Sequence, residues 1–337
     1  MVLYGGRSGE RDVSLVSGRA VLSALEESRA GGDGPARVLG VEIDEAGRWL
    51  LDGHGRPPLE ALERLPADAL VFFGLHGGEG EDGRLQGLLE IAGVPFTGSG
   101  PAASQRCMDK RTTRALAREA GISVAPGHWL ECERWRSAPE RAARQAWSAL
   151  ARGEAACVVA KPNAGGSSVD TARVAGIEEL TSALSMIFEG GDDALVEGWV
   201  EGLEATVGIV GNRSGSLRAL PVVEIRTKPG RFFDYEEKYG EDGATETCPP
   251  QELSPEVVER LSADALTAYR TLGCDGYARA DFIVPQEGGA EPVLLEVNTL
   301  PGFTPRSLLP QAASVAGASF GALCVELCAL ALDRVDA

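Results

Sequence analysis

The chain has 337 residues, of which 44% are hydrophobic and 24% charged, a balance that argues against a disordered protein and suggests two or three domains. Its formal charge of −18 argues against a nucleic-acid-coating protein, because such proteins carry basic patches. No run of 18 apolar residues occurs and an apolar stretch follows Met1 directly, so we expect neither a membrane span nor a signal peptide.

The first hundred residues alternate strand and helix signals. An apolar strand at 2–4 leads through a glycine-rich turn into a helical stretch at 13–25. A second apolar strand at 69–73 precedes a glycine-rich loop at 76–83 and a helix at 85–92. Strands that are apolar throughout are typical of sheets buried on both faces. We therefore expect a parallel α/β sheet with ligands at the loops that follow its strands.

The rest of the chain continues this alternation. We expect helices over 109–120 and 134–150, and strands over 157–160, 194–200 and 204–210. Residues 231–250 are polar and lack periodicity, which indicates a lid over a site. Ser254 and Pro255 begin a long helix that Gly273 ends. We divide the chain into three α/β units, 1–98, 99–197 and 198–337.

Seven scattered cysteines without Cys-x-x-Cys spacing predict neither a disulfide framework nor a zinc site, and they favour the cytoplasm. Only three histidines are present, which argues against a multi-histidine metal site. Cys324 and Cys328 stand four residues apart on an apolar helical pattern. This spacing indicates packing in a core rather than metal binding.

The most informative segment, 277–298, reads as a β-hairpin. Side chains two apart on a strand share a face, so Arg279 points the same way as Asp281, and Glu296 the same way as Asn298. A turn centred near 288–289 places Asp281 opposite Glu296. The same register places Arg279 opposite Asn298. Two carboxylates and an amide oxygen on one face suit Mg²⁺, although a surface hairpin with a solvated salt-bridge ladder is an equal alternative.

A phosphate site is indicated at the end of another strand. Lys161 ends an apolar run and directly precedes a loop of small residues at 162–168, whose amides can close over a phosphate. The alternative is a lysine that extends into solvent. The turn at 5–9 is a weaker candidate, and we find no P-loop and no motif for a covalent nucleophile.

Short motifs follow one another in a fixed order along nearly the whole chain, namely GGRSGERDVS at 5–14, LHG at 75–77, GEDG at 80–83, TGSG at 97–100, MDK at 108–110, KP at 161–162, GSSV at 166–169, YEEKY at 235–239, TCP at 247–249 and EVNTLPG at 296–302. In this order they resemble the D-alanine–D-alanine ligases, which are ATP-grasp enzymes. The resemblance implies an α/β fold with a three-domain ATP-grasp architecture and an N-terminal parallel-sheet, Rossmann-like domain.

The resemblance also implies a reaction. ATP phosphorylates the carboxylate of a first D-alanine, the amine of a second attacks the acyl phosphate, and the tetrahedral intermediate collapses to dipeptide, ADP and phosphate for peptidoglycan synthesis. It implies Mg²⁺, as two ions with Mn²⁺ as an alternative, held by Asp281, Glu296 and Asn298. The implied partners are small amino acids and a second copy of the chain, in the cytoplasm, with no nucleic acid and no membrane.

For ATP, the resemblance assigns phosphate contacts to three lysines, Lys110, Lys161 and Lys238. Glu197 and Glu204 match acceptors for the adenine amine and the ribose hydroxyls. Trp199 and Val200 lie on the hinge between them and contact the adenine.

For the amino acids, Arg279 matches the residue that faces the oxyanion of the tetrahedral intermediate. Asp12 matches the acid that binds the ammonium of the first D-alanine. The remaining substrate contacts match His76, Gly302, Ser307 and Leu308, with Ser307 placed for the second carboxylate. Ser167 and Tyr239 match a hydrogen-bonded set that closes the lid, joined by a glutamate from the first domain.

Four positions depart from the family pattern: Asp12 for glutamate, Asp170 for glycine, Gly198 for a larger hinge residue, and Arg306 for an uncharged residue or histidine. Asp12, Asp170 and Arg306 motivate an alternative, a divergent ATP-grasp ligase that joins another amino acid or amine in a biosynthetic pathway. A second alternative is a non-catalytic nucleotide-binding protein. The retained metal and phosphate residues disfavour it.

Overall fold

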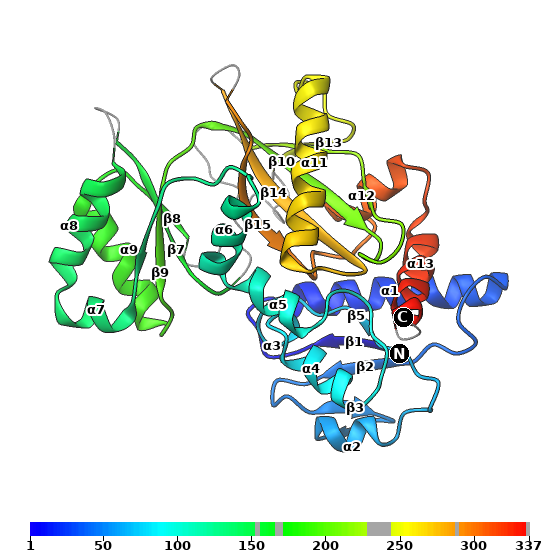
Figure 1. The fold of residues 1–337 in the computed structure, drawn as a ribbon. Coiled ribbons are helices and arrows are strands. Elements are labelled where there is room, and N and C mark those ends of the chain that lie inside the picture. The colour runs from blue at the N-terminus through cyan, green and yellow to red at the C-terminus, as the bar shows by residue number, and fades with distance from the viewer. Residues whose placement is uncertain (152–155, 166–170, 228–243, 287–289, 335–337) are drawn as a thin grey trace.

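The computed structural model describes residues 1–151, 156–165, 171–227, 244–286 and 290–334. Within these ranges the chain forms three β-sheets of five, four and six strands, and helices pack against each of them (Figure 1). The sheets follow one another along the chain. The domain seams near 98 and 197 stay a prediction.

The first sheet is mixed rather than wholly parallel. Its strands are β1 (Val2–Gly5), β2 (Gly40–Ile43), β3 (Trp49–Leu51), β4 (His54–Arg56) and β5 (Phe72–Phe73), in the order β4-β3-β2-β1-β5. β1 pairs in parallel with β2 and β5, as the apolar runs predict. β3 and β4 extend the sheet in antiparallel fashion, an edge that the apolar runs do not predict.

The helices of this unit are α1 (Arg11–Gly31), α2 (Pro58–Leu62), α3 (Gly78–Glu81) and α4 (Arg84–Ile91). The helix predicted over 13–25 is thus longer at both ends, and the loop 76–83 contains a helical turn. α1 packs closely on β1 because Gly18 has no side chain. A Cβ there would lie 2.3 Å from the ring of Tyr4.

The second sheet is antiparallel, with the order β6 (Gly127–Leu130), β9 (Ala194–Gly198), β7 (Val158–Pro162) and β8 (Ala172–Val174). Helices α7 (Cys132–Ser137), α8 (Pro139–Leu150) and α9 (Ile177–Glu189) lie beside it (Figure 1). The single helix predicted over 134–150 is wrong. Pro139 disfavours a helical conformation at the residue before it, and Ala138 adopts φ −159° and ψ 69°, which separates α7 from α8.

The third sheet is also antiparallel and carries most of the residues singled out from the sequence. Its order is β13 (Thr245–Thr247), β12 (Val223–Arg226), β10 (Gly202–Val210), β14 (Tyr277–Pro285) and β15 (Val293–Asn298), and β11 (Arg218–Ala219) pairs with β10. Helix α11 (Pro255–Leu272) packs against it. The predicted ends of this helix are confirmed: the Ser254 side chain accepts from the Val257 amide, and Gly273 adopts φ 82°.

Helices α5 (Pro101–Met108) and α6 (Lys110–Glu119) precede the second sheet in sequence but pack on the third. Ala103 and Ala117 share a buried cluster with Leu261 of α11 and Phe282 of β14. As a result, side chains on α6 reach the space between the second and third sheets.

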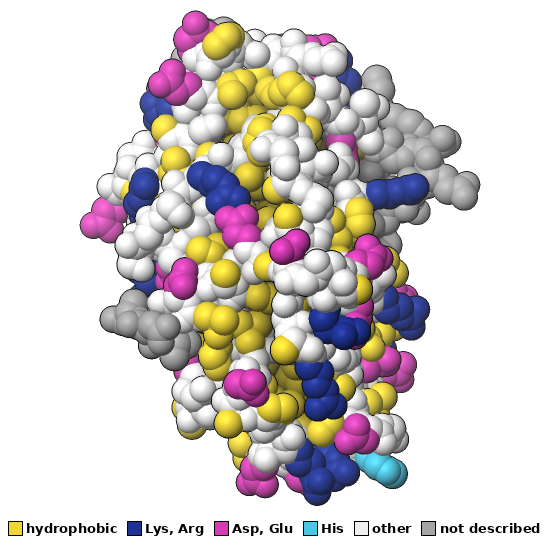
Figure 2. Space-filling model, turned by 90° about the vertical axis from the view of Figure 1, so that its right-hand side faces the viewer, with side chains coloured by type: hydrophobic (Ala, Val, Ile, Leu, Met, Phe, Trp, Pro, Cys, Tyr) yellow, Lys and Arg dark blue, Asp and Glu magenta, His cyan; other side chains and the backbone are white. Residues whose placement is uncertain are grey.

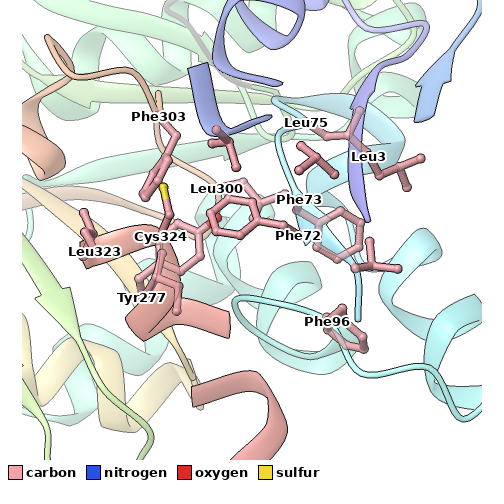
Figure 3. Packing of buried hydrophobic residues seen from close by; sticks show 14 of the residues in the cluster. Leu3, Phe72, Phe73, Leu75, Phe96, Tyr277, Leu300, Phe303, Leu323 and Cys324 are labelled. Atoms are coloured by element: carbon pink, nitrogen blue, oxygen red, sulfur yellow. The ribbon is translucent and has the colours of Figure 1, made fainter. Parts of the chain in front are cut away.

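A second buried cluster joins the first sheet to the C-terminal part of the chain (Figure 3). The ring of Phe303 lies 5.6 Å from Phe72 of β5 and 5.4 Å from Tyr277 of β14. Cys324, on α13 (Phe320–Asp333), is fully buried in this cluster, which confirms the predicted core packing. The cluster fixes the loop that follows β15 against the ends of the first-sheet strands.

On the face shown in Figure 2, acidic and basic side chains are interspersed among hydrophobic ones rather than gathered by sign. Among the described residues, no single helix is long and apolar enough to cross a membrane. Only α12 (Leu308–Val315) and α13 taken together, bent by 103°, reach that length and composition.

Candidate active site

A cleft lies between the second and third sheets, with about 1040 Å³ of space including the part open to solvent. Its walls come from β7, β9, β10, β14 and β15, with contributions from α6 and α12. Ten residues singled out from the sequence line it: Lys110, Lys161, Glu197, Trp199, Val200, Glu204, Arg279, Asp281, Glu296 and Leu308. Residues far apart in the sequence therefore meet in one place.

The hairpin of β14 and β15 has the predicted register. Asp281 pairs with Glu296 and Arg279 with Asn298, and a bulge follows Asp281. The Asn298 amide nitrogen donates to Asp281 over 2.9 Å, which places these side chains together. The alternation in sequence thus brings two carboxylates and an amide to the cleft side of the sheet.

Asp281 accepts hydrogen bonds from several neighbouring side chains. The Arg279 guanidinium donates to both of its oxygens over 2.8 Å. The hydroxyl of Thr206, directly opposite on β10, donates to Asp281 Oδ1 over 2.5 Å. These bonds hold the carboxylate in one orientation and fix the plane of the guanidinium.

The donor set of this group fits a magnesium ion. Mg²⁺ takes oxygen ligands and is usually bound through one or two carboxylates together with substrate phosphates. Asp281 and Glu296 supply the carboxylates, and Asn298 supplies an amide oxygen once its side chain turns. Among the residues that the structure describes, no group of three or more His, Cys, Asp or Glu side chains could hold a metal by itself.

Two lysines that line the cleft, Lys110 and Lys161, lie close to the buried Arg114. Lys110 donates to the Gly165 carbonyl over 2.7 Å and lies 3.8 Å from a Glu296 oxygen. Lys161 lies 2.5 Å from a Glu197 oxygen, and Arg114 forms an ion pair with the other oxygen of that carboxylate. Burial, reinforced by the positive charge of Lys110, lowers the pKa of Lys161 to about 7. In a chain of net charge −18, this cluster supplies local positive charge for an anionic ligand.

The hinge between β9 and β10 forms the end of the cleft. The Trp199 indole donates to Glu201 over 2.6 Å, and the Arg173 guanidinium lies 4.4 Å from the centre of the indole ring. The backbone amide of Gly198 donates to the Pro126 carbonyl over 2.9 Å. A glycine at 198 therefore leaves the backbone of the hinge bonded as part of the sheet.

The structure does not bring Asp12 to the site. Asp12 is exposed on the first turn of α1. Glu10, which precedes this helix, lies close enough for its charge to act on the buried His76 and Glu81, and a Cβ on Gly77 would lie 2.2 Å from a Glu10 oxygen. Asp12, two residues further along, is exposed to solvent, so Glu10 is the acid of this motif that lies near the buried His76. Both acids stand in the motif at 5–14, so the motif itself offered Glu10 as a second candidate.

His76 is buried, and both of its ring nitrogens have partners. Nδ1 lies 2.9 Å from the Leu300 carbonyl and Nε2 lies 2.8 Å from the Ser17 hydroxyl. Burial lowers the pKa of the imidazole, which favours its neutral form. His76 thus holds the loop after β15 rather than lining the cleft.

Glu81, which sequence reasoning left without a role, completes this attachment. One of its oxygens accepts from the Leu300 amide over 3.1 Å and the other from the Gly77 amide over 3.1 Å. Burial, with a further contribution from the charge of Glu10, raises the pKa of Glu81 to about 7. Leu300 is therefore bound at both its amide and its carbonyl by side chains of the first unit.

The remaining predicted residues divide into two groups. Ser307 caps the start of α12, and its hydroxyl accepts from the Thr304 amide over 3.0 Å, while Gly302 lies next to the buried Phe303. Three predicted site residues, Ser167, Lys238 and Tyr239, and the departure Asp170, lie outside the described residues.

Two family models match the chain. The model described as "D-ala D-ala ligase N-terminus" matches residues 1–67 and 54–99, and the one described as "D-ala D-ala ligase C-terminus" matches 116–329. The chain belongs to the D-alanine–D-alanine ligase family. The resemblance drawn from its motifs, and the ATP-grasp fold that it implies, are thereby confirmed.

Curated members of the D-alanine–D-alanine ligase family match almost end to end. The chain is 38% identical to the D-alanine–D-alanine ligase of Halalkalibacterium halodurans over 320 residues, covering 95% of this chain and 94% of the relative. It is 41% identical to that of Geobacter sulfurreducens over 315 residues, covering 93% and 87%.

Solved structures of the family share the fold. A VanG D-Ala:D-Ser ligase from Enterococcus faecalis has a TM-score of 0.79 at 30% identity, covering 98% of both chains. A D-alanine–D-alanine ligase from Bacillus anthracis complexed with ATP has a TM-score of 0.74 at 28% identity, covering 99% of this chain and 97% of the other.

Proposed function

We propose that this enzyme uses ATP to join two D-alanine molecules into D-alanyl-D-alanine for peptidoglycan synthesis, as a cytoplasmic homodimer. The observation that carries the proposal is the single cleft in which Lys110, Lys161 and Arg279 face Asp281 and Glu296. Phosphoryl transfer to a carboxylate needs cations for the phosphates and a second charge at the developing oxyanion. This cleft supplies both.

The nucleotide would lie along the cleft with its phosphates toward the hairpin. Lys110 and Lys161 would contact the phosphates, with Lys238 as the proposed third lysine. At the other end, Glu197 would accept the adenine amine and Glu204 the ribose hydroxyls, with Trp199 and Val200 beside the ring. The similarity to a structure complexed with ATP supports ATP as the nucleotide.

Asp281, Glu296 and Asn298 would hold Mg²⁺, two ions with Mn²⁺ as an alternative. When bound there, the metal would offset the negative charge of the phosphate oxygens. The bonds from Thr206 and Arg279 orient Asp281 for this role.

The first D-alanine would enter with its ammonium toward Glu10, the acid of the 5–14 motif that lies near His76 and Glu81. Its carboxylate displaces ADP from the γ-phosphorus and becomes an acyl phosphate.

The second D-alanine would bind with its carboxylate at Ser307, beside Gly302 and Leu308. Its amine attacks the carbonyl carbon of the acyl phosphate and loses a proton as phosphate leaves. Arg279, fixed by Asp281, would stabilise the oxyanion of the tetrahedral intermediate. Ser167 and Tyr239 would close the lid.

The proposal is tested by phosphate release with ATP and Mg²⁺ across D- and L-amino acids. Turnover with D-alanine that stops in Glu296→Gln, with unchanged circular dichroism, is the expected result. Turnover with another amino acid but none with D-alanine would favour the divergent ligase instead. Light scattering at working concentration tests the homodimer.

Two of the three departures that motivate that alternative lie within the described residues. Asp12 is exposed on α1, and Asp170 lies outside the described residues. Arg306 is exposed next to Ser307, and its carbonyl accepts from the Gln311 amide.

A further inference from the structure

Arg114 lies on α6 next to Glu197 and does not itself line the cleft. It is 5% exposed, and its guanidinium pairs with one oxygen of Glu197 and donates to the Ala125 carbonyl. The other oxygen of Glu197 lies 2.5 Å from the Lys161 ammonium. Glu197 is 4% exposed and Lys161 is 7% exposed. One buried carboxylate therefore lies between two buried cations.

The backbone leaves room for this arrangement at one position. Gly127 of β6 pairs with Glu197 of β9, so their side-chain positions share a face of the sheet. A Cβ on Gly127 would lie 2.6 Å from the Arg114 Nη2. The glycine opposite Glu197 thus provides the space through which the guanidinium passes.

The two cations differ in what they can do. Burial lowers the pKa of Lys161 to about 7, whereas the pKa of Arg114 falls only to about 10, so Arg114 keeps its charge at neutral pH. Lys161 also lines the cleft where phosphates would bind. If Lys161 turns toward a phosphate, Glu197 loses one counter-ion, and a buried carboxylate without a counter-ion is strongly unfavourable.

We infer that Arg114 is a positioning residue that holds Glu197 ionised and oriented toward the base, so that Lys161 can turn to the phosphates. The inference rests on the proposed roles of Glu197 and Lys161. An ionised carboxylate accepts hydrogen bonds and donates none. It therefore suits the amino group of adenine and disfavours the carbonyl oxygen that hypoxanthine carries at the same position. Arg114 thereby sets the preference for ATP over ITP.

The experiment measures kcat/KM for ATP and for ITP by phosphate release with D-alanine. Arg114→Gln is expected to lower the ATP-to-ITP ratio about tenfold or more, because it weakens a hydrogen bond to a charged group. Arg114→Lys keeps the charge and should retain most of the ratio. Arg118→Gln, an exposed change one turn along the same helix, is the matched control and should retain all of it.

A double variant separates positioning from general loss of packing. Glu197→Gln alone should lower the ratio, and adding Arg114→Gln to it should lower the ratio no further, because Arg114 acts through Glu197. Gly127→Ala is a second route to the same effect. The added methyl group displaces the guanidinium while the arginine itself is kept. If Arg114→Gln fails to fold, the ATP-to-ITP ratio of Gly127→Ala tests whether Arg114 positions Glu197.

Two results would overturn the inference. If Glu197→Gln lowers the ratio but the folded Arg114 variants and Gly127→Ala leave it unchanged, Arg114 has no positioning role, and the proposed ligase function stands. If Glu197→Gln itself leaves the ratio unchanged, the adenine contact fails and the inference fails with it. Phosphate release with D-alanine would still report the ligase activity in that case.

Discussion

Glu81 is expected to make the stability of the enzyme fall as the pH rises. Burial, and then the charge of Glu10, raises the pKa of this carboxyl from 4.5 to about 7. The folded chain therefore keeps a proton that the unfolded chain releases, so the stabilising effect is full below about pH 4.5 and is lost as the pH rises through about 7. The difference between the folded and unfolded pKa values corresponds to about 3 kcal/mol of unfolding free energy, and most of this is lost between about pH 5 and pH 8.

Glu81→Gln removes this titration. Because the variant keeps a single acceptor for the amides of Gly77 and Leu300, we expect a constant loss of about 1–3 kcal/mol from the other hydrogen bond. The informative quantity is therefore the change with pH. As the pH rises from about 5 to about 8, the unfolding free energy of Glu81→Gln, measured by urea unfolding, should increase by about 2–3 kcal/mol relative to that of wild type. Glu119→Gln, at an exposed position, should gain nothing. Parallel pH profiles for wild type and Glu81→Gln would refute the reasoning.

Three further changes probe the cleft. Arg279→Ala should lower kcat by about a hundred- to a thousandfold in steady-state assays, as expected for a cation at an oxyanion, and a loss confined to KM would contradict that role. Glu296→Gln should abolish Mg²⁺-dependent turnover while the melting curve stays cooperative, and retained activity would remove this carboxylate from the metal set. Glu10→Gln should raise the KM for D-alanine by about tenfold or more, whereas Asp12→Asn should leave it unchanged. The reverse pattern would show that Asp12 binds the ammonium of the first D-alanine.

Local patterns predict well what depends on local geometry. The register of β14 on β15 follows from the period of two along each strand and the position of the turn, so Asp281 could be placed opposite Glu296. The start of α11 follows from Ser254 and its end from Gly273. In these cases the residues that decide the structure stand next to one another in the sequence.

Local sequence patterns do not predict contacts between segments that lie far apart in the chain. Glu81 binds Leu300, 219 residues away, and no pattern around either residue announces the pair. Arg114 reaches Glu197 because α6 packs on the third sheet although it precedes the second. The exchange of Glu10 for Asp12 has a smaller cause. The motif at 5–14 contains two acids, and the match to the family assigned the ammonium to the second, Asp12, whereas the first, Glu10, is the one that lies near His76.

The cleft uses its two kinds of cation for different tasks. Arginines hold the acids: Arg279 binds both oxygens of Asp281, and Arg114 pairs with Glu197. A guanidinium keeps its charge when buried, as Arg114 does with a pKa of about 10, and its fork orients a carboxylate in a plane. Lys161 is compact and sensitive to its surroundings, since burial brings its pKa to about 7, and an arriving phosphate would favour its charged form. Lys161→Arg should therefore bind Glu197 more firmly and weaken ATP binding, and an unchanged Kd for ATP would show that the type of cation is unimportant there.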